Sequence, residues 1–162
     1  MRAARELLTA EGVEALTLGR VAQALGIKPP SLYKHFAGKR ALEAVLIAEG
    51  LEAHARALFD SGDSLASIAS AYRRFALANP QLYRLMTERP LPRDLLPPGL
   101  EERAAAPVIR AAGGDPDLAR AAWAFAHGMV QLELADRFPA GADLSAAWDT
   151  AVAAFETRVR QP

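Results

Sequence analysis

The fold is decided by residues 18–36, which read LGRVAQALGIKPPSLYKHF. Four apolar residues are spaced to bury one face of two short helices: Val21, Leu25, Ile27 and Leu32. Thr17 predicts the N-cap of the first helix. Gly26 stands where a tight turn needs a positive φ, and Pro29 can open the second helix. The pattern predicts a helix-turn-helix, whose second helix lies in the major groove of DNA.

The same spacing alone also fits an ordinary helical hairpin, so the flanking charges matter. Tyr33, Lys34 and His35 lie on a helix that is too polar for a core, and Lys39 and Arg40 follow at the start of the next helix. Backbone N–H groups at a helix N-terminus favour an anion such as phosphate. Although the net charge of the chain is zero, no acid lies in residues 21–41. These features favour DNA binding over the hairpin.

At this point the sequence resembles the tetracycline-repressor-like (TetR) family of regulators. The resemblance is carried by Gly12, residues 15–18, Val21-Ala22, Leu25-Gly26, residues 30–33, His35-Phe36, Lys39 and Leu42. It implies DNA contacts by Thr17, Lys28, Pro29, Pro30, Ser31, Tyr33, Lys34, His35 and Lys39. Tyr33 would touch phosphate, Lys34 would read base edges, and Thr17 and Lys39 would hold phosphates. Leu32 and Phe36 would be core residues.

Two departures from the family pattern weaken this prediction. Gly19 stands where the family often has a basic residue, which here is one place later, at Arg20. The basic arm that often precedes the first helix is not in this sequence, so either DNA affinity depends on the recognition helix alone or the natural chain has residues before Met1. An alternative therefore stays open: a dimeric small-molecule-binding protein whose DNA-binding head is weakened.

The rest of the chain also predicts helices, because alanine, leucine, arginine and glutamate are abundant and no segment alternates in the manner of a strand. We expect an all-α fold of about nine helices, with a DNA-binding domain at 1–48 and an effector-binding and dimerisation domain at 49–162. The expected helices cover 1–11, 17–25, 29–36, 39–59, 64–78, 81–87, 100–112, 116–138 and 144–160. A proline-rich loop at 90–99 separates two of them.

Trp123, His127 and Gly128 resemble the Trp-His-Gly type of TetR C-terminal domain. The resemblance implies an effector cavity in this part of the chain, and we expect it to be lined by Tyr72, Phe75, Tyr83, Met86, Trp123 and His127. Residues of these types are equally suited to a core, and a structural role for His127 is the simpler interpretation. Since few charges occur there, the sequence favours an apolar effector that is uncharged or anionic.

The last two long helices carry apolar residues at helical spacing and predict a dimer surface. The residues expected there are Val130, Leu134, Leu144, Trp148, Val152 and Phe155. The TetR resemblance implies a four-helix interface between two copies. Two-fold symmetry would then set the recognition helices roughly 34–36 Å apart on a palindromic operator.

Other function classes find no support in the sequence. The motifs of nucleotide-binding enzymes, serine hydrolases and zinc proteases are absent, so we expect neither an enzyme nor a cofactor. The chain has no cysteine, and its three histidines are too scattered for a metal site. Without a signal peptide or an apolar span, the protein is predicted to be cytoplasmic. The resemblance favours a repressor released by a small molecule, while an activator stays open.

Overall fold

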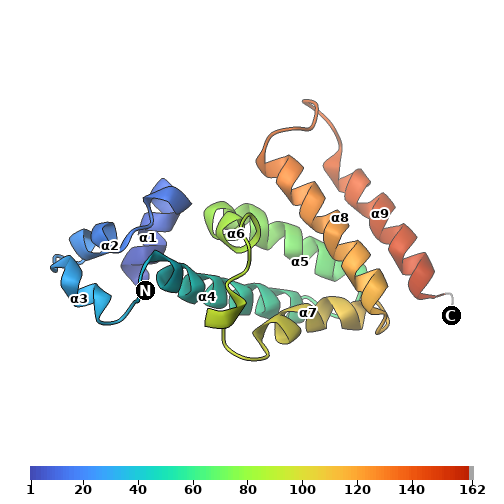
Figure 1. Ribbon diagram of the computed structural model, residues 1–162. Helices are drawn as coiled ribbons and strands as arrows, with labels where there is room; N and C mark the ends of the chain where they lie inside the picture. The colour runs from blue at the N-terminus through green and yellow to red at the C-terminus, as the bar shows by residue number, and fades with distance from the viewer. Residues whose placement is uncertain (161–162) are drawn as a thin grey trace. The chain divides into compact units, whose positions relative to one another are not determined.

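A computed structural model describes residues 1–160, over which the chain forms nine α-helices, two short 3-10 helices and no strand (Figure 1). In chain order they are α1 (Arg2–Glu11), η1 (Val13–Ala15), α2 (Leu18–Ala24), α3 (Pro29–Tyr33), α4 (Lys39–Phe59), α5 (Leu65–Ala78), α6 (Pro80–Thr87), η2 (Arg93–Leu95), α7 (Leu100–Ala111), α8 (Pro116–Leu134) and α9 (Leu144–Val159). The prediction of an all-α fold is confirmed.

The chain divides into two compact units, and the division differs from the expected 1–48 and 49–162. Unit 1 contains Met1–Glu52 together with Asn79–Leu100, and unit 2 contains residues 53–78 and 101–160. Residues 79–100 belong to unit 1 because Leu85 of α6 is buried in its core, where Leu91 and Leu96 also pack. A boundary drawn at the end of a sequence motif does not detect such a distant segment.

Leucine side chains fill the core of unit 1. Its most deeply buried leucines are Leu8, Leu16, Leu42, Leu46 and Leu85. Each buried side chain of this size stabilises the fold by about 1.5–3 kcal/mol. Gly50 lets α4 and α6 approach closely, since a Cβ atom there would lie 2.7 Å from the Met86 sulfur. The core thus joins α6 to the helix-turn-helix.

Unit 2 is built around α5, which contacts both α8 and α9. Figure 1 shows α8 and α9 running antiparallel, joined by a loop. Tyr72 of α5, Val130 of α8 and Trp148 of α9 are all buried in this unit. The three helices therefore bury their apolar faces against one another.

Several local expectations change in the structure. Leu25 and Ile27, both expected in the core, are exposed, because they lie between α2 and α3 rather than on a packed helix face. The helix expected over 116–138 ends at Leu134, because Asp136 adopts a φ of 50° and the N–H groups of Asp136 and Arg137 close the last turn.

The helix expected over 29–36 is also shorter in the structure. It ends at Tyr33 and continues as a turn in which Phe36 N–H bonds Leu32 O at 2.9 Å.

Within the described residues, no helix is both long and apolar enough to cross a membrane.

Candidate nucleic-acid interface and effector cavity

The turn between α2 and α3 forms as the sequence predicts. Thr17 is the N-cap of α2, and its hydroxyl accepts a hydrogen bond from Arg20 N–H at 3.2 Å. Gly26 has a φ of 66°, the left-handed conformation that glycine adopts without strain. Val21, Ala22 and Leu32 are buried and hold the two helices together. The helix-turn-helix prediction is confirmed in its geometry.

The residues expected to meet DNA lie together around α3. Seven of them are exposed: Lys28, Pro29, Pro30, Ser31, Tyr33, Lys34 and His35. Tyr33 is 60% exposed, so its ring and hydroxyl are accessible. Thr17 and Lys39 are half-buried at the edge of this surface. The exposed Tyr33 of α3 is thus flanked by Lys28 and Lys34, the residues at the two ends of this short helix.

Lys39 is held by groups from η1 and from its own helix, α4. Its ammonium lies 3.7 Å from Glu43 Oε1 and 4.0 Å from Glu14 Oε2, and it donates to Val13 O at 3.5 Å. Arg89, which follows α6, forms ion pairs with the same two carboxylates. Two cations therefore share two anions beside the first turn of α4.

The other arginines near the head are also engaged in ion pairs. Arg20 donates two hydrogen bonds of 2.7 Å to the carboxylate of Glu11. Arg40 forms a two-point ion pair with Asp94, and this guanidinium lowers the pKa of the Asp94 carboxyl. All four groups are exposed, so these ion pairs orient side chains more than they stabilise the fold.

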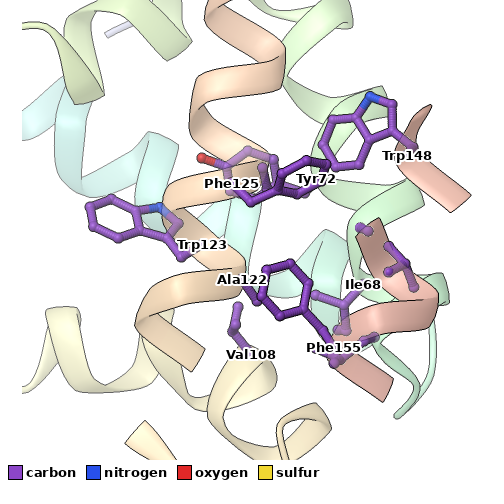
Figure 2. Close-up of a pocket in the computed structure, with 12 residues that line it drawn as sticks. Ile68, Tyr72, Val108, Ala122, Trp123, Phe125, Trp148 and Phe155 are labelled. Carbon is purple, nitrogen blue, oxygen red and sulfur yellow. The ribbon is translucent and has the colours of Figure 1, made fainter. Parts of the chain in front are cut away.

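Unit 2 contains a small apolar cavity between α5, α7, α8 and α9 (Figure 2). Its volume is about 30 Å³, room for a water-sized molecule. It is lined by Leu65, Ile68, Ala69, Tyr72, Val108, Ala122, Trp123, Phe125, Ala126, Trp148, Val152 and Phe155. Phe125 packs edge-on against Trp148, with ring centroids 5.4 Å apart. Five of the twelve lining residues are aromatic, so rotation of these side chains would change the size of the cavity.

A buried charge lies behind Trp148. The Glu133 side chain is only 6% exposed and accepts a 2.8 Å hydrogen bond from the Trp148 indole N–H. Its other oxygen accepts from Arg73 at 2.8 and 3.0 Å. The Arg73 guanidinium also lies 5.9 Å from the centre of the Trp148 ring. These contacts fix the indole as one wall of the cavity.

His54 is a buried polar group that the sequence did not single out. Its ring packs between Tyr72 and Phe75, at centroid distances of 4.8 and 4.9 Å. Its Nε2 has no hydrogen-bond partner among the described residues. Burial lowers the pKa of His54 to about 4, so the ring is neutral at pH 7.

The structure brings together only part of the expected effector site. Tyr72 and Trp123 line the cavity, although the Trp123 indole points to the other side of α8 from Phe125 and Trp148 and is 52% exposed (Figure 2). The other expected residues do not line it: Phe75 packs on His54, and the His127 ring lies 6.1 Å from the Trp123 ring. Tyr83 and Met86 are buried in unit 1.

The residues expected at a dimer surface are placed inside unit 2 instead. Val130, Trp148 and Val152 are buried within the single chain, and Leu134, Leu144 and Phe155 are half-buried. Helices α8 and α9 pack on α5, and Trp148, Val152 and Phe155 line the cavity, so Val130, Trp148 and Val152 are covered by their own chain. Periodicity alone does not distinguish a face buried within a chain from one buried between chains.

Two family models match this chain. Residues 1–45 match that of the bacterial regulatory proteins of the tetR family, and residues 65–155 match that of the tetracyclin repressor-like C-terminal domain. The chain belongs to the tetR family. The Trp-His-Gly subtype stays a prediction.

One relative is an HTH-type transcriptional regulator, which fits the tetR-family assignment. The chain is 38% identical over 87 residues to the uncharacterized HTH-type transcriptional regulator YobS of Bacillus subtilis. That match covers 50% of this chain and 46% of YobS, so the chain spans less than half the length of this relative.

Solved structures resemble the tetR-family chain over nearly its whole length. The crystal structure of the putative regulatory protein SCO4313 has a TM-score of 0.76 at 28% identity, covering 99% of this chain and 93% of that one. A variant of TetR from Acinetobacter baumannii AYE, solved in complex with minocycline, has a TM-score of 0.66 at 28% identity. The match covers 99% of this chain and 96% of that chain.

Among the described residues of the present chain, no cluster of three possible metal-ligating side chains occurs.

Proposed function

We propose that this chain is a cytoplasmic repressor that binds a palindromic DNA operator as a dimer and is released by a small apolar effector. The observation that carries the proposal is the exposed surface of α3. Leu32 alone of this helix is buried, while Tyr33 and Lys34 face solvent beside the half-buried Lys39. Buried leucines beneath would hold these groups in the fixed orientation that reading a groove requires.

Each residue has a role that fits its position. Lys34 can donate to guanine in the major groove, and the Tyr33 hydroxyl can donate to phosphate. Lys39 lies in the first turn of α4 and can join the free N–H groups there in holding another phosphate. Thr17 already uses its hydroxyl oxygen as the cap of α2, so its phosphate contact would come from the hydroxyl proton.

We propose that the dimer forms through the outward faces of α8 and α9 rather than through the buried residues first expected. Exposed or half-exposed residues recur on these faces at helical spacing: Ala121, Ala124, Gly128 and Leu132, then Ala146, Thr150, Ala153 and Thr157. The hydroxyls of Thr150 and Thr157 bond carbonyls of their own helix, so their methyl groups can meet an apolar surface. We expect Ala153→Arg to yield monomers in analytical ultracentrifugation.

The cavity in unit 2 supports an effector that is neutral and apolar. None of its lining side chains carries a charge, and a drug-sized ligand needs about 300–1,000 Å³. Since the cavity holds only about 30 Å³, binding would require the aromatic wall to move. Trp148 is the ring that resists movement most, because its displacement would break its hydrogen bond to Glu133, whereas Phe125 and Phe155 make no such bond.

One observation favours the alternative, a ligand-binding protein with a weakened DNA-binding head. Arg20, the basic residue next to Gly19, is neutralised by Glu11 through two hydrogen bonds and is not free for phosphate. On this alternative the effector cavity and the dimer would remain, while DNA affinity would be low and equal for all sequences.

The two candidates separate in a selection from random-sequence duplexes with the purified protein. The repressor predicts enrichment of two inverted half-sites, centred about one helical turn or a multiple apart. The wild type should bind the selected duplex in fluorescence anisotropy, and Tyr33→Ala and Lys34→Ala should weaken binding at least tenfold. Thr9→Ala, on the exposed face of α1, is the matched control. No enrichment would reject the repressor in favour of the alternative.

A further inference from the structure

Arg89, in the segment that follows α6, forms ion pairs beside the first turn of α4. Arg89 Nη1 lies 3.4 Å from Glu43 Oε1, the same oxygen that lies 3.7 Å from the Lys39 ammonium. The other guanidinium nitrogen, Nη2, contacts Glu14, whose second oxygen lies 4.0 Å from Lys39. Arg89 and Lys39 therefore compete for the same two carboxylates.

The balance of charge depends on Arg89. With it, two cations face two anions; without it, Lys39 alone would face both Glu14 and Glu43. The Glu43 side chain is only 13% exposed, so water screens its charge poorly and the ammonium is the group left to neutralise it. Lys39 is 34% exposed and must turn away from these carboxylates to reach a phosphate.

We propose that Arg89 is a positioning residue for DNA binding: it neutralises Glu14 and Glu43 and so frees Lys39 to hold phosphate. This inference rests on the proposed phosphate contact of Lys39. Arg89 itself acts through Lys39, from a segment that follows α6 and is anchored in unit 1 by Leu91 and Leu96. Any movement that draws Arg89 away would lower DNA affinity without altering α3.

The chain offers a matched control for charge. Arg84 lies on α6 and forms an ion pair with Glu88 at 3.7 Å, so Arg84→Ala removes the same positive charge without touching the carboxylates around Lys39. Beyond about 8 Å, physiological salt screens the general effect of a lost charge. A difference between Arg89→Ala and Arg84→Ala thus reports the local network.

The test measures affinity for the selected duplex by fluorescence anisotropy at several salt concentrations. We expect Arg89→Ala to weaken binding about tenfold, equal to about 1.4 kcal/mol. The salt slope should fall by about 0.9, the loss of one phosphate contact. Arg89→Lys should retain most of the affinity, and Glu43→Gln in the Arg89→Ala background should restore both the affinity and the slope. Arg84→Ala should stay within about twofold of the wild type.

The outcomes separate this inference from the proposed function. If the wild type binds selectively but Arg89→Ala matches Arg84→Ala, or if Glu43→Gln restores nothing, the role of Arg89 is overturned and the repressor stands. If the wild type itself does not bind selectively, the proposed function fails and this inference fails with it. If Arg89→Ala does not unfold cooperatively on heating, and so is not properly folded, the DNA affinities of Arg89→Gln and Arg89→Lys are compared instead.

Discussion

The two compact units fill their interiors in different ways. In unit 1, leucines such as Leu16, Leu42 and Leu46 occupy the core, and the charged groups lie at its edge in shared ion pairs. In unit 2, the rings of Phe125 and Trp148 leave a cavity beside a buried glutamate. A filled core holds its surface helices in one geometry, whereas aromatic side chains around a cavity can move to admit a ligand. The first suits reading DNA and the second suits sensing a ligand.

The largest effect should come from removing the ring that closes the cavity. Trp148→Ala deletes a side chain that is 5% exposed and leaves Glu133 with one fewer donor, so we expect a loss of about 3–5 kcal/mol in the free energy of unfolding. Added indole should fill the space and raise the urea midpoint again. Trp123→Ala, which removes a largely exposed indole, should cost less than about 1 kcal/mol. Equal losses in the two variants would contradict a packed aromatic wall.

A second effect concerns pH and again belongs to unit 2. The pKa of His54 is lowered to about 4, while an unfolded histidine titrates near 6.5. Between these values the unfolded state binds a proton that the folded state does not, so stability falls as the pH falls from about 6.5 to 4. The loss should approach about 3 kcal/mol. Above pH 7 it should vanish.

His54→Phe is the matched comparison, because it keeps an aromatic ring between Tyr72 and Phe75 and removes the titrating group. Urea unfolding of both proteins at half-unit pH steps gives the difference directly, since carboxylate contributions cancel. A difference that stays constant from pH 7 to pH 4 would show that the ring is not buried as described.

The smallest effect should come from the cap of α2 in unit 1. Thr17→Ala removes the acceptor of Arg20 N–H and should cost about 1 kcal/mol. Thr17→Ser keeps the hydroxyl and should lie within a few tenths of the wild type. Comparing their unfolding with their operator affinity separates the cap from a phosphate contact. If Thr17→Ala unfolds like the wild type, the capping bond contributes nothing.

The sequence predicts those parts of the structure that depend on neighbouring residues. The α2–α3 turn and the exposed residues of α3 follow from glycine, proline and polarity within twenty residues, and the structure agrees. The sequence does not predict contacts between residues that lie far apart along the chain. Leu85 and Arg89 join the head from more than forty residues beyond α3, and no spacing rule links them to Glu14 or Glu43.

The interior of unit 2 is also hard to predict from the sequence, because it too depends on contacts between distant segments. Trp148 and Val152 have the spacing of a buried face, but the pattern does not say whether α5 or a second copy covers it. The sequence therefore predicts a dimer surface from six residues, of which Trp148, Val152 and Phe155 line the cavity. The sequence does not predict the lowered pKa of His54. That pKa is lowered by burial, and the rings that bury His54 reach it only when the chain folds.

The proposed function requires a rigid head that reads DNA sequence. The measurement that tests it most directly is the affinity of the wild type for the selected duplex and for a scrambled duplex of equal composition, both at physiological salt. We predict that the selected duplex binds at least about 1,000-fold more tightly, as specific regulators do. Equal affinity for the two duplexes would contradict the claim and leave only the non-specific attraction between cations and phosphates.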